Sequence, residues 1–216
     1  MQPQAVGRVV TRIIAGQAGG RRLATSPGRG TRPTSDRTRE GLFATVTAIR
    51  GGLDGAAVLD LYAGSGAVGL EALSRGASDV LLVEADSRAA RVIAENIATV
   101  GLPGARLVTG KVDRLLGRGP DEGMPPRDFV FADPPYAATD DQLTRILTAL
   151  ARDDWLAPGA LVVLERATRS GPPTWPAGYE SDRSRRYGEA TLWYGLAAGA
   201  QPAAISRRES EPECGE

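Results

Sequence analysis

The stretch Val58-Leu-Asp-Leu-Tyr-Ala-Gly-Ser-Gly-Ala-Val-Gly69 decides the fold of this chain. An apolar run over 57–62 is followed by glycines at 64, 66 and 69, and then by a helix-like segment over 68–75. Glycines at this spacing, after a strand and before a helix, allow a tight turn and close approach of the backbone to a ligand. The pattern therefore indicates the first βα unit of an open α/β sheet, with a ligand loop at its carboxyl edge.

Strands and helices alternate after this loop. Strands are expected at 79–84, 106–109, 129–132 and 161–165, with helices at 87–100, 112–116 and 141–151 between them. Continuous apolar strands separated by helices predict a parallel sheet covered by helices on both faces. Two last strands, around 179–185 and 190–196, would add an antiparallel pair joined by a turn at Tyr187-Gly188-Glu189, which makes a mixed seven-stranded sheet.

The N-terminal part is expected to be a separate extension. Strand-like runs at 11–15 and 21–25, with three glycines between them, predict a small β-hairpin. A helix capped by Ser35 or Asp36 is expected to run to about Arg50. We therefore predict a basic arm with a hairpin at 1–33, an α/β domain at 34–197 and a polar, disordered tail at 198–216.

Composition excludes several chemistries. The chain has no histidine and a single cysteine, Cys214, so catalysis by Ser-His-Asp or Cys-His groups and a disulfide framework are ruled out, and no metal site is expected. The first residues lack the apolar run of a signal peptide, and no segment has the apolar length of a membrane span. A cytoplasmic protein with no membrane partner is expected.

Charge is unevenly distributed along the chain. The net charge is zero, but residues 1–50 carry nine arginines against Asp36 and Glu40, a local net charge of +7. Such a basic segment on an otherwise acidic chain suggests a polyanionic partner. A solvated arginine-rich surface is the alternative, because Lys111 is the only lysine and arginine is the usual cation here. The arginines are Arg8, Arg12, Arg21, Arg22, Arg29, Arg32, Arg37, Arg39 and Arg50.

Acidic residues lie beside the glycine loop. Asp60 precedes Gly64 by four residues, where a carboxylate suits an ammonium group and would repel a pyrophosphate. Glu84 ends the next strand, where a carboxylate accepts hydrogen bonds from a ribose diol. The alternatives are a turn or capping residue at Asp60 and a surface charge at Glu84. Asp113 follows the third strand, where such folds contact an adenine amine, but a helix-capping role explains it equally well.

The tetrapeptide Asp133-Pro-Pro-Tyr136 follows the fourth strand, at the edge of the sheet where ligands bind in open α/β folds. Pro134 and Pro135 fix the backbone, so the Asp133 carboxylate and the Pro134 carbonyl can both accept hydrogen bonds from one NH2 group. Preorganised acceptors stabilise the charge that builds on nitrogen during methylation, and Tyr136 can stack on a base. An Asp-Pro turn with an aromatic plug is the alternative.

These motifs resemble those of class I methyltransferases that act on amino groups. The N-terminal stretches Arg12-Ile-Ile-Ala-Gly16, Gly20-Arg-Arg-Leu23 and Arg32-Pro-Thr-Ser-Asp-Arg-Thr-Arg-Glu40, with Phe43, are similar to the bacterial 16S rRNA guanine-966 N2-methyltransferase family, as are Gly69-Leu-Glu-Ala72 and Tyr187-Gly188. The resemblance implies a Rossmann-like class I methyltransferase fold, S-adenosyl-L-methionine as cofactor, and a guanine of small-subunit ribosomal RNA, in a partly assembled 30S particle, as substrate.

The resemblance and the motifs together give a set of expected site residues. The catalytic residues are expected to be Asp133, Pro134, Pro135 and Tyr136. The cofactor is expected to contact Asp60, Tyr62, Gly64, Ser65, Gly66, Gly69, Glu84, Ala85, Asp113, Arg32 and Thr34, with Arg32 to Arg37 near its methionine end. RNA is expected to contact Arg12, Arg21, Arg22, Arg29 and Arg37, with the arm extending over the catalytic face.

Three other functions fit part of the sequence. An N6-adenine methyltransferase of DNA or RNA can use the same Asp133-Pro-Pro-Tyr136 loop, although the short tail leaves no room for a sizeable target-recognition domain. A nicotinamide oxidoreductase would explain the glycines and Glu84 but gives that loop no task. A non-catalytic RNA-binding assembly factor would use the arginine arm alone.

Overall fold

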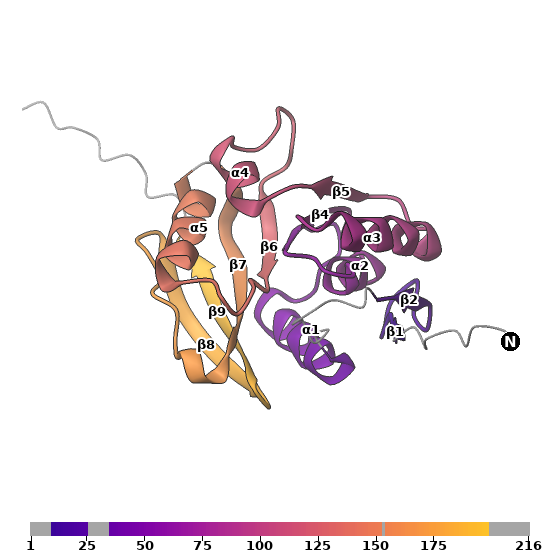
Figure 1. The fold of residues 1–216 in the computed structure, drawn as a ribbon, viewed down its shortest axis with the longest axis horizontal. Coiled ribbons are helices and arrows are strands. Elements are labelled where there is room, and N and C mark those ends of the chain that lie inside the picture. The colour runs from indigo at the N-terminus through magenta and orange to yellow at the C-terminus, as the bar shows by residue number, and fades with distance from the viewer. Residues whose placement is uncertain (1–9, 26–34, 153, 199–216) are drawn as a thin grey trace, which may run out of the picture.

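A computed structural model describes residues 10–25, 35–152 and 154–198 of the chain (Figure 1). Its main sheet has seven strands in the order β5-β4-β3-β6-β7-β9-β8. The neighbours from β5 to β7 pair in parallel, while β9 pairs antiparallel with both β7 and β8. The predicted mixed seven-stranded sheet is confirmed. The strands are β3 (Ala57–Leu61), β4 (Asp79–Glu84), β5 (Ala105–Thr109), β6 (Arg127–Ala132), β7 (Leu156–Ala167), β8 (Tyr179–Tyr187) and β9 (Ala190–Ala197).

Strand β7 is longer than predicted, because it begins at Leu156 rather than Leu161. Its first residues include Pro158 and Gly159, which read as a break in the sequence. The pairing with β6 shifts there, from Arg127 opposite Leu156 to Phe129 opposite Leu161. The extra residues of β7 therefore form an irregularity within a continuing strand.

Helices cover both faces of the sheet (Figure 1). Apolar side chains of the first three helices share one buried cluster with the face of the sheet that carries Val58 and Phe131. Side chains of the last two helices share a second cluster with the face that carries Leu59 and Val130. The helices are α1 (Asp36–Arg50), α2 (Ala67–Ser74), α3 (Ser87–Val100), α4 (Val112–Gly117) and α5 (Asp140–Arg152), with a short 3-10 turn η1 (Thr168–Ser170) after β7.

The first helix begins at the predicted cap. Ser35 has an extended backbone, and its Oγ accepts a hydrogen bond from Thr38 N over 3.1 Å. The helix ends at Gly51, whose φ of 78° is left-handed, as a C-terminal cap requires. The first half of α1 lies at the carboxyl edge of the parallel strands, because Gly41 packs closely on the ring of Tyr187 in β8.

The N-terminal hairpin, β1 (Val10–Arg12) with β2 (Arg22–Ala24), packs on α2 and α3 (Figure 1). The buried carboxylate of Glu71 in α2 accepts hydrogen bonds from Ile14 N over 2.6 Å and Ala15 N over 3.0 Å. Leu23 of β2 is fully buried. Apart from Ala198, the predicted tail lies outside the described residues, as does the expected boundary at 33. No helix within the described ranges is long and apolar enough to cross a membrane.

Candidate active site

The strand order places the two predicted ligand loops side by side. The chain runs outward from β3 through β4 to β5, and then returns to place β6 against the other side of β3. Ligands of open α/β sheets bind at such a switch point, outside the carboxyl ends of the strands. The glycine loop after β3 and the Asp133 loop after β6 both leave the sheet at this edge.

The glycine loop brings α2 very close to β4. A Cβ atom on Gly66 would lie 3.0 Å from Leu82 Cδ2, and one on Gly69 would lie 3.0 Å from the same atom and 3.1 Å from Asp60 Oδ2. Gly66 also has a φ of 77°, so a side chain there would be strained as well as crowded. Tyr62 takes a φ of 61° without being glycine, and such outliers concentrate at functional sites.

Asp60 is a buried carboxylate that braces this loop. Only 1% of the residue is exposed, and Oδ2 accepts a hydrogen bond from Gly69 N over 2.8 Å. Burial raises the pKa of Asp60 to about 7, although the Gly69 bond acts in the opposite direction. The bond supports the alternative interpretation of a turn residue. The ammonium contact is still a prediction, and a cationic ligand would offset the cost of burying this charge.

Glu84 and Asp113 are both brought to the glycine loop. Glu84 is half-buried at the end of β4, where it accepts hydrogen bonds from Gly64 N over 2.9 Å and Asp86 N over 2.8 Å. Asp113 lies exposed in the first turn of α4, and the side chain at the N-cap position, Lys111, makes no capping bond. Burial and then the charge of Asp113 raise the pKa of Tyr62 to about 12, so Asp113 lies near the loop.

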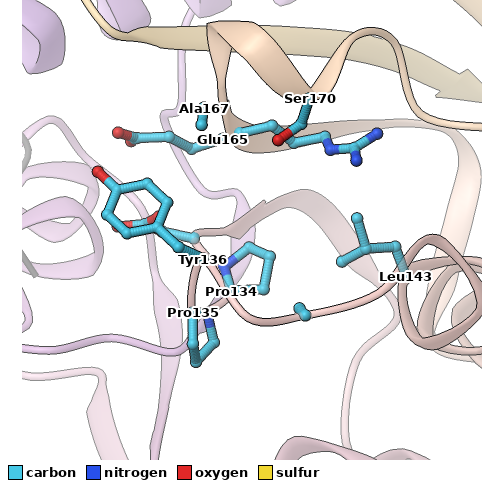
Figure 2. Close-up of a pocket in the computed structure, with 10 residues that line it drawn as sticks. Pro134, Pro135, Tyr136, Leu143, Glu165, Ala167 and Ser170 are labelled. Atoms are coloured by element: carbon cyan, nitrogen blue, oxygen red, sulfur yellow. The ribbon is translucent and has the colours of Figure 1, made fainter. Parts of the chain in front are cut away.

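The Asp133 loop forms the floor and one wall of an open pocket of about 320 Å³, counting its mouth to solvent (Figure 2). Pro134 is buried, while Pro135 and Tyr136 are exposed, and the Pro135 carbonyl accepts a hydrogen bond from Ala138 N over 2.8 Å. Tyr136 is the only large apolar side chain in the described ranges that is exposed, at 65%. An aromatic ring on a rigid loop beside a pocket suits stacking on a flat base.

A third acidic residue, Glu165, lines the pocket with Asp133. Phe131 pairs with Val163 and Ala132 with Leu164, so Asp133 and Glu165 continue this register on neighbouring strands. Burial, followed by the charges of Glu165 and Asp60, raises the pKa of Asp133 well above its usual range. Sequence reasoning missed Glu165, although it ends a predicted strand as Glu84 does.

The predicted RNA-contacting arginines are only partly placed near this site. Arg12, Arg22 and Arg37 are exposed, and Arg12 Nε lies 3.8 Å from Asp36 Oδ2 at the start of α1. Arg21 instead donates hydrogen bonds to the carbonyls of Thr99 and Val100, at the C-terminal end of α3. That end lies at the opposite edge of the sheet, so the prediction that Arg21 extends over the catalytic face is wrong. Arg29, Arg32 and Thr34 lie outside the described residues.

Comparison with known proteins identifies close relatives. A family model described as Conserved hypothetical protein 95 matches residues 11–195. The chain is 36% identical over 188 residues to Ribosomal RNA small subunit methyltransferase D of Escherichia coli K12, covering 87% of this chain and 90% of that protein. It is 34% identical over 163 residues to the protein of the same name from Haemophilus influenzae, covering 76% and 81%.

Solved structures give the same result. A methyltransferase from Escherichia coli superposes with a TM-score of 0.76 at 34% identity, covering 88% of this chain and 99% of that one. An S-adenosylmethionine-dependent methyltransferase from Streptococcus mutans, only 12% identical, reaches 0.65 over 82% of this chain and 54% of that one, a likeness of fold alone. The fold is thus the predicted class I methyltransferase fold. Because the family model spans most of its length, this chain belongs to the family described as Conserved hypothetical protein 95, together with Ribosomal RNA small subunit methyltransferase D.

Proposed function

We propose that this protein transfers a methyl group from S-adenosyl-L-methionine to the exocyclic N2 amine of a guanine in small-subunit ribosomal RNA. The observation that carries this proposal is the Asp133-Pro-Pro-Tyr136 loop, held beside the glycine loop at the switch point of the sheet. The family relationship supports it, since the Escherichia coli and Haemophilus influenzae relatives are small-subunit ribosomal RNA methyltransferases by name.

The residues around the glycine loop fit the proposed cofactor. S-adenosyl-L-methionine supplies a methyl group on a positively charged sulfur, and it carries an ammonium group and a ribose diol. The buried Asp60 carboxylate suits the ammonium group, because a positive charge stabilises the ionised form of this acid. Glu84 already accepts two main-chain N–H bonds, and its half-buried carboxylate suits the diol.

The Asp133 loop accounts for the amine chemistry. The lone pair of an exocyclic amine is delocalised into the base, which makes the nitrogen a poor nucleophile. Acceptance of its two hydrogens by the Asp133 side chain and the Pro134 carbonyl would let the nitrogen rehybridise toward the methyl group. Positive charge then builds on nitrogen next to a carboxylate, which stabilises the transition state, and the nitrogen finally loses one proton.

We place the substrate in a partly assembled 30S particle in the cytoplasm. The exposed Arg12, Arg22 and Arg37 supply positive charge near the first half of α1, at the same edge as the pocket. Arginines contact phosphates and stack on unpaired bases, which is how single-stranded RNA regions are recognised. The loop itself holds an amine and does not choose one guanine among many, so these arginines would add the selection.

Methyl transfer to defined particles tests this function. Small subunits that lack the guanine modification should accept radiolabelled methyl groups, whereas fully modified subunits should not. Nucleoside digestion followed by mass spectrometry should recover N2-methylguanosine, and Asp133→Ala provides the inactive control. Recovery of N6-methyladenosine instead, or no transfer to either particle or to naked small-subunit RNA, would contradict the proposal.

A further inference from the structure

The pocket beside the Asp133 loop presents two carboxylates to a substrate rather than one. Side chains alternate between the faces of a strand, and the register of β6 and β7 brings Asp133 and Glu165 level on neighbouring strands, about 5 Å apart along the sheet. Both residues therefore project to the same face, which is the face covered by α1 and α2. In Figure 2 the carboxylate of Glu165 and the ring of Tyr136 extend toward the same side of the pocket.

The basic residue next to Glu165 projects to the other face. Arg166 donates hydrogen bonds to Asp140 at the start of α5 and to the carbonyl of Pro172. Its guanidinium group is thus tied to α5, and Glu165 and Asp133 keep the reacting side of the pocket acidic. Such a pocket favours a ligand edge made of hydrogen-bond donors over one that presents an acceptor.

The two purines differ in this respect. Next to its N2 amine, the Watson–Crick edge of guanine carries the N1–H group, so three N–H bonds lie in one row. Next to its N6 amine, adenine carries N1 as an unprotonated acceptor, which a carboxylate repels. Enzymes that modify a flipped base read this edge by hydrogen bonding. A second carboxylate beside the amine-holding group therefore distinguishes guanine from adenine.

We infer that Glu165 is the residue that selects guanine, by accepting a hydrogen bond from the base N1–H while Asp133 and the Pro134 carbonyl hold the N2 amine and Tyr136 stacks on the ring. This inference rests on the proposed function and deepens it, because the Asp133 loop alone serves guanine and adenine equally well. Asp133 contacts the reacting nitrogen, whereas Glu165 contacts the neighbouring position and sets specificity.

Electrostatics within the pocket support this division of tasks. The two acids repel one another, and this repulsion adds to burial in raising the pKa of Asp133. A base edge with three donors satisfies both carboxylates at once and relieves that repulsion. An adenine would satisfy one carboxylate and leave the other facing an acceptor, which is costly for a group that is already partly desolvated.

The test uses a base analogue that keeps the amine but lacks the adjacent donor. Small subunits are reconstituted with ligated RNA that carries either guanine or 2-aminopurine at the target position. The second base has the 2-amino group and an unprotonated N1. The rate ratio between the two substrates is measured for the parent, Glu165→Gln and Glu165→Ala. Because the two amines differ in intrinsic reactivity, the informative quantity is the change in this ratio caused by each variant.

We expect both variants to narrow the preference for guanine by about 10–100-fold, the range for one good base contact. Glu165→Gln should also gain rate on 2-aminopurine, because its amide can donate to N1. Glu180→Gln, an exposed acid at the far end of β8, is the matched control and should keep the parent ratio. Cofactor affinity and thermal midpoint serve as checks on folding, and the ratio is internal to each variant.

The outcomes separate the two proposals. A parent enzyme that methylates guanine, with variants that keep its full guanine preference, would overturn the role of Glu165 alone. A parent enzyme that methylates neither substrate, while its cofactor binding is intact, would overturn the proposed function itself.

Discussion

The side-chain amide of Asn96 donates a hydrogen bond to the main-chain carbonyl of Ser65, 2.8 Å away. Asn96 lies on α3, and Ser65 lies in the glycine loop. The same buried side chain accepts from Ala24 N over 2.8 Å and donates to Ala24 O over 2.9 Å. One residue therefore ties the N-terminal hairpin to the glycine loop, so the arm and the predicted cofactor site are mechanically linked.

Replacement of Asn96 by alanine should weaken both stability and cofactor binding. The change leaves buried main-chain groups of Ala24 and Ser65 without a partner, and each unsatisfied group costs about 1–3 kcal/mol. We expect a loss of about 2–4 kcal/mol in the free energy of unfolding and weaker binding of S-adenosyl-L-methionine. Chemical denaturation and calorimetry measure the two quantities. Arg88→Ala, an exposed change on the same helix, should alter neither. Loss of stability with normal cofactor affinity would show that the Ser65 bond is dispensable for the loop.

Cofactor binding should release a proton from Asp60. Burial raises the pKa of this carboxyl from 3.8 to about 7, so at neutral pH a fraction of the free protein holds the proton. An ammonium group bound beside Asp60 stabilises the ionised form and lowers its pKa. Affinity should therefore rise as pH increases up to about 7 and level off above it.

Calorimetry in buffers of different ionisation enthalpy counts these protons directly. Asp60→Asn keeps an acceptor for Gly69 N but has no proton to release, so its affinity should be lower and independent of pH over this range. If the parent protein binds the cofactor without proton release at pH 6 to 7, the ammonium group does not sit beside Asp60.

Asp133→Ala should lose most turnover while it retains cofactor affinity. Removal of one preorganised acceptor costs about 10²–10³ in rate. Single-turnover methylation of small subunits measures the loss, and calorimetry measures cofactor affinity. A variant with near-normal turnover would exclude Asp133 from the chemistry.

Turnover should also fall in acid at a pH above the ordinary range of an aspartate. The ionised form of Asp133 accepts from the amine, and burial together with the charges of Glu165 and Asp60 raises its pKa. The ionised fraction, and with it the rate, therefore declines as pH drops through this raised value. Glu165→Gln removes one of the two charges, so the acidic limb of the pH–rate profile should move to lower pH. A limb that stays in place would mean that another group controls it.

The sequence predicted the parts of the site that follow from local pattern. The Gly64-Ser-Gly66 turn, the acids that end strands β3 and β4, and Asp133-Pro-Pro-Tyr136 were all placed at one edge, because the carboxyl ends of parallel strands meet there. Cap positions such as Ser35 were also readable from sequence. These features depend on a few neighbouring residues and on the direction of the strands.

Features that depend on register or long-range packing were not predictable in the same way. The level position of Glu165 beside Asp133 follows from pairing between two strands separated by a helix. Arg127 looked like the end of an exposed loop, yet it is fully buried and paired with Asp79 on β4. Arg21 looked like a free cation, but it is engaged with the end of α3. Each outcome required knowledge of which distant segment packs alongside.

The last prediction uses this difference between the arginines of the hairpin. Arg12 and Arg22 are paired opposite each other across the hairpin, and both are exposed. If they contact phosphates, their joint replacement by alanine should weaken binding to small subunits and lower the salt slope by a little under about two units, roughly 0.7–0.9 per contact. Cofactor affinity should be unchanged.

Arg21→Ala is the matched comparison, because it removes an arginine from the adjacent position in the chain. Its guanidinium group donates to the carbonyls of Thr99 and Val100, so its loss should lower the thermal midpoint by loosening the hairpin on α3. The salt slope of RNA binding should stay near that of the parent, because this arginine is already engaged within the protein. The opposite pattern, a reduced slope for Arg21→Ala and a normal slope for the double variant, would place the RNA along the far end of α3 rather than across the pocket edge.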